Sequence, residues 1–338
     1  MTSNKSRLAT IQIADLYTVT PPEANPFSDD FSLTSADAAC NARLRLFEEQ
    51  IDLAGTELCD LVVAAEDMMG MESFMTFLDD RSLFRSMLEN HCPVYHERLS
   101  DVARRHSMHI VACFYDLEGE DIYNFGFLYG RDGDLIGKYR KVHLPLYESW
   151  QVKSGSEFPV FETDIGKVGI NICYDQMWPE STAATALNGA QIVCMPSAAS
   201  PFEFRVRARA LDSQIFFITS TYANSMIAAP NGEVLANAGD QKRGFVHADV
   251  DVADSTLASE TFYEYLYSGI RDHKERHLKF RRPESYNPLT TQSPPLSSDY
   301  PAAGLADSDQ EIQRVYEIHK TEMKKTLRGE KTDYNWRW

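Results

Sequence analysis

Three reactive side chains stand where predicted strands end. Glu66 follows the apolar run 61–65, Lys141 follows a predicted hairpin, and Cys173 follows the alternating run 166–172. In sheet proteins the ligand crevice lies beyond strand ends, so these side chains could converge at one site. A thiol helped by a carboxylate and an ammonium could attack the carbon of an amide or a nitrile.

Each group has a separate task in such chemistry. A thiol attacks well only as thiolate; nearby positive charge can lower its pKa, and the Glu66 carboxylate can accept its proton. The attack builds negative charge, which the Lys141 ammonium and the backbone N–H of Tyr174 can stabilise. Water then cleaves the acyl-thioester, with the same carboxylate as base. The pattern therefore indicates C–N bond hydrolysis through a covalent intermediate.

Each residue also has a simpler interpretation. Most free cysteines are small buried apolar residues, which would explain Cys173. Lys141 lies beside Lys138 and Arg140, and a basic run usually marks a solvated face. Glu66 could end a strand on a solvated loop. Taken singly, none of the three would be assigned to catalysis, so the assignment depends on their joint sequence context.

That context consists of three motifs in order along the chain. They are Val62-Val-Ala-Ala-Glu66, Tyr139-Arg-Lys-Val-His-Leu144 and Ile172-Cys-Tyr-Asp-Gln-Met-Trp-Pro-Glu180. Together they resemble the glutamate, lysine and cysteine segments of the nitrilase (carbon–nitrogen hydrolase) superfamily, and the resemblance covers roughly residues 8–252. It implies an αββα sandwich, no cofactor, and a homodimer or higher homo-oligomer.

The same resemblance implies roles for single residues. Glu66 corresponds to the general base, Lys141 to the charge-stabilising residue and Cys173 to the nucleophile. Many members of the family carry a second glutamate shortly after the lysine segment, and Glu148 stands in position for it. An ordinary loop residue is an equally good interpretation of Glu148.

The residues after the cysteine indicate the branch of the family. Nitrilases usually have Trp-Glu there, whereas Tyr174-Asp175 and the following Trp178-Pro-Glu180 resemble amidases and carbamoylases. We therefore expect a small-molecule linear amide or N-carbamoyl amine as substrate, cleaved with release of ammonia. Two alternatives stay open: a nitrilase that makes a carboxylic acid from a nitrile, and a catalytically silent member that acts as a binding protein.

The elements that must position these residues alternate between strands and helices. Predicted strands cover 8–14, 61–65, 110–115, 122–129, 135–136, 157–162, 166–172, 191–195, 215–220, 225–229, 233–236 and 245–252. Predicted helices cover 36–54, 93–105, 179–188, 202–212 and 311–328, with Pro93 near the start of the second. This order predicts a layered α/β domain, and the resemblance makes it a four-layer αββα sandwich of two mixed β-sheets with outer helices.

The domain organisation follows from a change of composition late in the chain. We expect a hydrolase domain over 1–282 and a C-terminal extension over 283–338 that packs on the domain or on a partner subunit. The stretch 283–309 is rich in Pro, Ser, Thr and Asp, which is typical of a loose segment. The tail Trp336-Arg-Trp338 carries aromatics of the kind that often pack on a partner.

Composition limits partners and location. The 338 residues carry a net charge of −17, so nucleic acid and anionic membrane would be repelled and are not expected as partners. No signal peptide or membrane span is expected. The six scattered cysteines indicate reduced thiols and a cytoplasmic location. His273-Lys-Glu-Arg-His277 has metal-ligand spacing, but a solvated helix face is favoured, so no metal is expected.

Overall fold

The computed structural model describes residues 5–200, 202–253, 281–286, 289 and 309–332. The chain divides into two compact units, Met1–Ser259 with Arg337–Trp338 and Glu260–Trp336. The strands of the described residues all belong to the first unit. Within the described part of the chain, no helix is long and apolar enough to cross a membrane.

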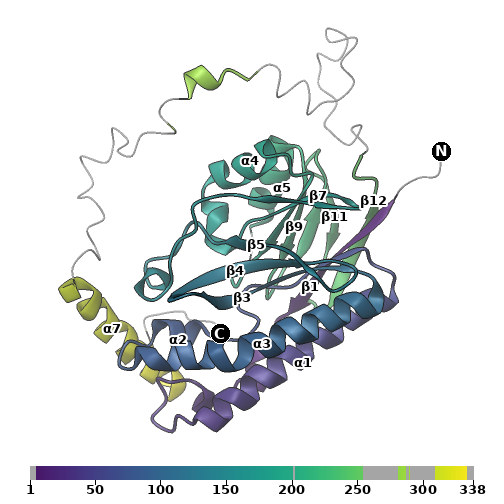
Figure 1. The fold of residues 1–338 in the computed structure, drawn as a ribbon. Helices are drawn as coiled ribbons and strands as arrows, with labels where there is room; N and C mark the ends of the chain where they lie inside the picture. Colours follow the sequence, from purple (N-terminus) through teal and green to yellow (C-terminus); the bar gives the residue numbers. More distant parts are fainter. Residues whose placement is uncertain (1–4, 201, 254–280, 287–288, 290–308, 333–338) are drawn as a thin grey trace, which may run out of the picture. The chain divides into compact units, whose positions relative to one another are not determined.

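Two six-stranded mixed sheets form the centre of the first unit (Figure 1). The first sheet has the order β12-β1-β2-β3-β4-β5, and the second has the order β11-β10-β9-β8-β7-β6. The first comprises β1 (Ser6–Ile13), β2 (Leu61–Val63), β3 (His109–Glu118), β4 (Asp121–Tyr129), β5 (Leu135–Arg140) and β12 (Arg243–Val250). The second comprises β6 (Val160–Thr163), β7 (Gly166–Ile170), β8 (Ile192–Pro196), β9 (Phe216–Ser220), β10 (Met226–Ala228) and β11 (Val234–Asn237).

Helices cover the outer face of each sheet. Apolar side chains of α1 (Leu33–Thr56) and α3 (Arg81–His106) pack on the first sheet, and those of α4 (Pro179–Leu187) and α5 (Glu203–Ser213) pack on the second. A separate apolar cluster fills the space between the two sheets. The order of layers confirms the predicted αββα sandwich of two mixed sheets with outer helices.

The short strand β2 shows why a continuous apolar run was needed at the centre. Leu61 and Val63 point into the cluster between the sheets, whereas Val62 points into the cluster under α1 and α3. All three are fully buried, as expected for a strand with parallel neighbours on both sides. The chain leaves this strand toward Glu66 inside the protein.

Helix α3 corrects the predicted helix over 93–105. It has 26 residues, and Pro93 lies in its interior rather than near its start. Proline removes one helical hydrogen bond and costs about 3 kcal/mol or more inside a helix. Buried residues at helical spacing, including Phe84, Leu88 and Tyr95, continue on both sides of it. Burial of this apolar face outweighs the local preference of proline.

The second unit is described only in part. It contains the 3-10 helix η7 (Pro283–Ser285) and the helix α7 (Asp309–Leu327). The bounds of α7 differ by one or two residues from those of the predicted terminal helix over 311–328. The predicted boundary between residues 282 and 283 stays a prediction. His273, His277 and the Trp336-Arg-Trp338 tail lie outside the described residues.

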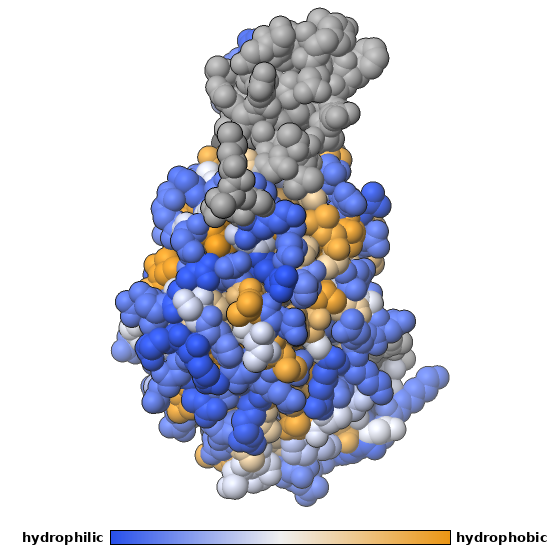
Figure 2. All heavy atoms as spheres, turned by 90° about the vertical axis from the view of Figure 1, so that its right-hand side faces the viewer, coloured by the Kyte–Doolittle hydropathy of each residue, from blue (hydrophilic) through white to orange (hydrophobic). Residues whose placement is uncertain are grey.

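One face of the molecule is drawn in Figure 2. Hydrophilic residues predominate there, in keeping with the charge of the chain, and hydrophobic ones stand in small separate groups. Scattered exposed apolar side chains are normal in folded domains.

Candidate active site

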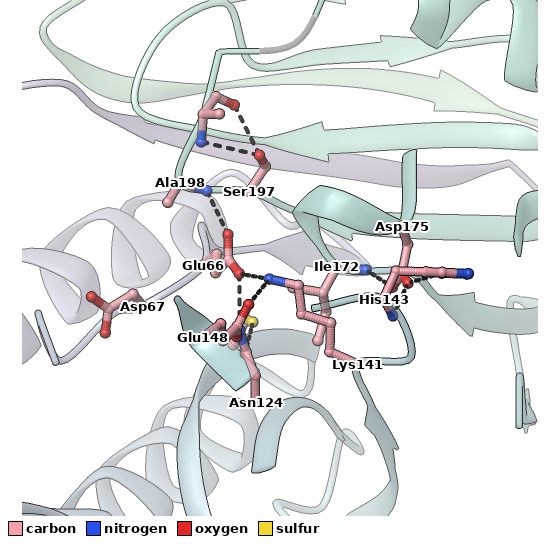
Figure 3. A network of polar contacts seen from close by, with 12 residues as sticks. Glu66, Asp67, Asn124, Lys141, His143, Glu148, Ile172, Asp175, Ser197 and Ala198 are labelled. Carbon is pink, nitrogen blue, oxygen red and sulfur yellow. Dashed lines mark hydrogen bonds and ion pairs between the residues drawn. The ribbon is translucent and has the colours of Figure 1, made fainter. Parts of the chain in front are cut away.

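A buried ammonium between two carboxylates forms the centre of the site (Figure 3). Nζ of Lys141 lies 2.8 Å from Oε1 of Glu66 and 2.7 Å from Oε2 of Glu148. None of the three side chains is more than 5% exposed. Taking a single charge out of water is costly, so charges this deep are found paired and hydrogen-bonded. The structure thus brings together three of the residues singled out in the sequence.

Asn124, which sequence reasoning missed, joins the two carboxylates. Its Nδ2 donates to Oε1 of Glu66 at 2.9 Å and to Oε1 of Glu148 at 2.7 Å. Its Oδ1 accepts a hydrogen bond from the Cys113 thiol at 3.4 Å. The available signal was a lone amide within the apolar strand β4, because a buried polar side chain needs partners.

Glu66 lies just past the end of β2 and is held at both its main chain and its carboxylate. The Tyr222 hydroxyl donates to the Glu66 carbonyl at 2.9 Å, and the Ala198 N–H donates to Oε2 at 2.8 Å. The following residue, Asp67, has a φ of +53°, so the chain turns sharply there. The buried Arg43 fixes this turn by donating to the Asp67 carbonyl at 2.7 Å.

Lys141 and Glu148 come from the segment that follows β5. The Lys141 N–H donates to the Asn124 carbonyl at 2.9 Å, and its own carbonyl accepts from Gly155 N–H at 2.8 Å. Glu148 begins the 3-10 helix η3 (Glu148–Trp150) and is 1% exposed. It therefore lies in the charge network and not on a solvated loop, while its role in catalysis stays a prediction.

Cys173 lies on a strained turn just past β7. It begins the 3-10 helix η4 (Cys173–Met177) and has a φ of +40°, in the region that favours glycine. Non-glycine residues persist there only where the surroundings enforce the conformation, and such residues cluster at functional sites. The α4 helix then begins at Pro179, as the sequence predicted.

The carboxylate of Asp175 enforces this turn. It is fully buried and accepts hydrogen bonds from Ile172 N–H at 2.8 Å, His143 N–H at 3.0 Å and the Tyr139 hydroxyl at 2.7 Å. The donors belong to both the cysteine motif and the lysine motif. Asp175 therefore fixes Cys173 relative to the segment that carries Lys141, a positioning role that the sequence did not reveal.

The environment of the Cys173 thiol keeps it protonated. Cys173 is half-buried, whereas the other five cysteines are buried. Burial and the charge of Glu66 raise the pKa of Cys173 to about 12, although Lys141 and a hydrogen bond with Ser197 act in the opposite direction. Sequence reasoning had allowed nearby positive charge to bring the thiol pKa below its usual value. Lys141 opposes the rise in the pKa of Cys173 but does not overcome it. The residue is a thiol at neutral pH, and its hydrogen bond with Glu66 offers a route for the proton.

Lys141 stays charged in this environment. Burial acts to lower its pKa, but the charges of Glu148 and Glu66 outweigh burial and raise the pKa well above its usual range. Burial and the Glu66 charge raise the pKa of Glu148, while Lys141 and Asn124 oppose that rise. The ammonium is therefore a permanent positive charge beside the thiol.

Two hydrogen-bond donors remain near Cys173. An ammonium has three N–H bonds, and two of those on Lys141 point to Glu66 and Glu148. The backbone N–H of Tyr174, in the first turn of η4, makes no hydrogen bond with another described residue. The arrangement offers a nucleophile, a proton acceptor and donors for a developing negative charge. Among the described residues, no group of three or more His, Cys, Asp and Glu side chains could hold a metal ion.

The fold and the site define a hydrolase class, and comparison with known proteins agrees. Residues 49–259 match the family model for carbon–nitrogen hydrolases, so the chain belongs to the carbon–nitrogen hydrolase (nitrilase) superfamily, whose enzymes act on C–N bonds. A relative named as a probable nitrilase, from Schizosaccharomyces pombe, is 29% identical over 53% of this chain and 73% of its own length. The omega-amidase of Homo sapiens is 30% identical over 46% of this chain and 66% of its own length.

Solved structures share the fold. An amidase from Nesterenkonia sp. superposes with a TM-score of 0.60 at 20% identity, covering 75% of this chain and 92% of that chain. The NitFhit protein of C. elegans superposes with a TM-score of 0.63 at 20% identity, covering 85% of this chain and 67% of that chain.

Proposed function

We propose that the protein is a thiol amidohydrolase that cleaves the C–N bond of a small linear amide or N-carbamoyl amine. The observation that carries the proposal is the half-buried Cys173 thiol beside the buried Glu66–Lys141–Glu148 network. A thiol with raised pKa is a poor nucleophile alone, so it needs a base in contact. Glu66 meets that need because its carboxylate is hydrogen-bonded to the thiol.

In the first half of the reaction, Cys173 forms a bond to the amide carbon. Glu66 takes the thiol proton as the sulfur attacks, and the carbonyl π electrons move to oxygen. The third N–H of Lys141 and the N–H of Tyr174 stabilise that oxygen. The tetrahedral adduct then collapses, Glu66 passes its proton to the nitrogen, and ammonia leaves an acyl-thioester.

In the second half of the reaction, a water molecule attacks the acyl-thioester after ammonia has left. Glu66 takes a proton from water as it attacks the thioester, and the proton returns to sulfur as the acid leaves. Glu148 does not meet the substrate in this scheme. It holds the Lys141 ammonium in place and, with Asn124, keeps the Glu66 carboxylate oriented.

The relatives support this choice of reaction. Several are named omega-amidases, and the Nesterenkonia amidase has been crystallised with butyramide and with acrylamide added at its active site cysteine. A nitrilase that converts a nitrile directly to an acid is the second candidate, because relatives in Schizosaccharomyces pombe and Pyrococcus abyssi carry nitrilase names.

An ammonia-release assay over linear amides, N-carbamoyl amines and their matching nitriles tests the proposal. We expect release from amides or N-carbamoyl amines, and its loss in Cys173→Ala. Cys59→Ala is the matched control, since it removes a buried thiol outside the site. Hydrolysis that survives Cys173→Ala would contradict the mechanism, and turnover of nitriles alone would favour the nitrilase.

Assembly and location are part of the proposal as well. We propose a homodimer or higher homo-oligomer in the cytoplasm, without nucleic acid or membrane as partner. The support is the negative charge of the chain and the family resemblance of its motifs. Light scattering of the purified chain gives its subunit number.

A further inference from the structure

The turn 197–199, just past β8, contacts the Glu66 carboxylate (Figure 3). Its Ala198 N–H donates to Oε2 of Glu66 at 2.8 Å. The Ser197 N–H donates to the Ser220 carbonyl at 2.8 Å, which anchors the turn to β9. The turn therefore touches the proposed base directly, from a strand other than those that carry Glu66, Lys141 and Cys173.

The Ser197 hydroxyl braces this turn from within. It accepts the Ala199 N–H at 3.1 Å and donates to the Ala199 carbonyl at 2.9 Å. Serine hydroxyls stabilise such local turns because one oxygen can donate and accept at once. Ser197 is fully buried, so water does not reach its hydroxyl. The direction of the Ala198 N–H, which lies between the two bonded residues, is therefore set by this hydroxyl.

The hydrogen bonds to the Glu66 carboxylate show which of its oxygens can act as the base. Each carboxylate oxygen can accept about two hydrogen bonds. Oε1 accepts from Lys141 at 2.8 Å and from Asn124 at 2.9 Å, so both of its positions are taken. Among the described residues, Oε2 accepts one backbone N–H, that of Ala198. Its second position is left for the Cys173 thiol, which is hydrogen-bonded to Glu66.

Strand register brings Ser197 close to the nucleophile. The strands β7 and β8 run parallel, and Ile170 pairs with Cys194. The Asn171 N–H donates to the Cys194 carbonyl at 3.0 Å. Cys173 and Ser197 stand at the same offset from this pair, so both lie past the same edge of the second sheet. In keeping with this placement, a hydrogen bond with Ser197 acts to lower the pKa of Cys173.

We propose that Ser197 is a positioning residue that aims Oε2 of Glu66 at the Cys173 thiol by way of the Ala198 N–H. The proposal rests on the proposed function, because it assigns the oxygen that takes the thiol proton and later a proton of water. The proton moves from sulfur to Oε2 while the sulfur electron pair forms the bond to the amide carbon. The Ala198 N–H also stabilises the ionised carboxylate, which is the form that acts as base.

Ser197→Ala removes the brace and changes the size of the side chain little. We expect kcat for an amide or N-carbamoyl amine to fall about tenfold, with KM within about twofold of wild type. The acid limb of the kcat/KM profile reports protonation of the base in the free enzyme. It should move to higher pH by about half a unit to one unit, because the carboxylate loses part of a donor that favours its charged form.

Ser220→Ala is the matched control. Ser220 is equally buried, and its hydroxyl donates to the Ile11 carbonyl at 2.7 Å instead of bracing a contact of Glu66. This variant should keep the wild-type acid limb even where it loses stability. Ser197→Thr retains the hydroxyl and should restore the limb. Ala198→Pro removes the N–H itself and should move the limb further than Ser197→Ala does, whereas Ala198→Gly keeps the N–H and the wild-type limb.

A titration of the Glu66 carboxyl tests the same contact without requiring hydrolysis. Glutamate labelled with carbon-13 at Cδ is incorporated into the protein, its NMR signals are followed against pH, and Glu66→Gln identifies the signal of Glu66. The titration midpoint should move to higher pH in Ser197→Ala by about half a unit to one unit. It should stay at the wild-type value in Ser220→Ala.

The outcomes separate the two proposals. If no amide, N-carbamoyl amine or nitrile is hydrolysed, the proposed function fails, and the carboxyl titration still decides the role of Ser197. An unchanged midpoint in Ser197→Ala, or an unchanged acid limb where an amide is hydrolysed, would overturn that role. An equal shift in Ser220→Ala would show a general effect of packing and would overturn it as well.

Discussion

Replacing Lys141 by methionine removes the one cation that Glu66 and Glu148 share. Methionine keeps much of the length of the side chain, so the change is mainly one of charge. Both carboxylates stay buried, and among the described residues Asn124, the Ala198 N–H and the Cys173 thiol still donate to them. Breaking a buried ion pair from one side costs about 3–5 kcal/mol of unfolding free energy. We expect a loss in this range and no measurable ammonia release.

The loss should also depend on pH. Burial raises the pKa of Glu148 in the folded protein. When the folded-state pKa of an acid lies above its unfolded-state pKa, the free energy of unfolding falls as the pH rises from the unfolded-state pKa through the folded-state pKa. In Lys141→Met the opposing pull of the ammonium is gone, so this effect grows. Urea unfolding followed by circular dichroism should therefore show a larger deficit against wild type at about pH 8 than at about pH 5.

Two further variants make this prediction refutable. Adding Glu148→Gln to Lys141→Met removes the repulsion and should restore about 1–3 kcal/mol of stability without restoring activity. Lys153→Met is the control, because the pair of Lys153 with Asp121 is exposed and should contribute little. A Lys141→Met protein no less stable than Lys153→Met, or one whose deficit shrinks as pH rises, would refute the reasoning.

Two other predictions concern the nucleophile and its turn. Because the pKa of Cys173 is raised to about 12, its alkylation by iodoacetamide should keep accelerating from about pH 7 to pH 9; a plateau below pH 8 would show a much lower pKa. Asp175→Asn weakens the acceptor of the hydrogen bonds from Ile172 N–H, His143 N–H and the Tyr139 hydroxyl, so kcat should fall about 10- to 100-fold, together with a lower melting temperature. Steady-state kinetics and calorimetry measure this effect, and an Asp175→Asn enzyme with wild-type kcat would contradict the positioning role.

The sequence was informative where one residue type follows a regular element. The buried run that ends before Glu66 and the alternating run that ends before Cys173 both form strands, and Lys141 follows a strand of the first sheet. These patterns are local, with a period set by strand geometry, so they can be read without a structure. The sandwich itself needed the family resemblance, because alternation of strands and helices does not specify two sheets.

The sequence was uninformative where contacts join distant segments. Asn124 is 58 positions from Glu66, and Asp175 is 32 positions from His143, so neither hydrogen bond leaves a local pattern. The predicted helix start near Pro93 was wrong because burial of the apolar face of α3 outweighs the tendency of proline to stand at a helix start.

The central claim is that Cys173 becomes acylated during turnover. Rapid acid quenching of the enzyme with a slowly hydrolysed amide, followed by intact mass spectrometry, measures this directly. The account predicts a mass increase equal to the amide minus ammonia, located on the Cys173 peptide and absent from Cys173→Ala. Turnover of the amide by Cys173→Ala at the wild-type rate, with no adduct on the wild-type protein, would contradict it.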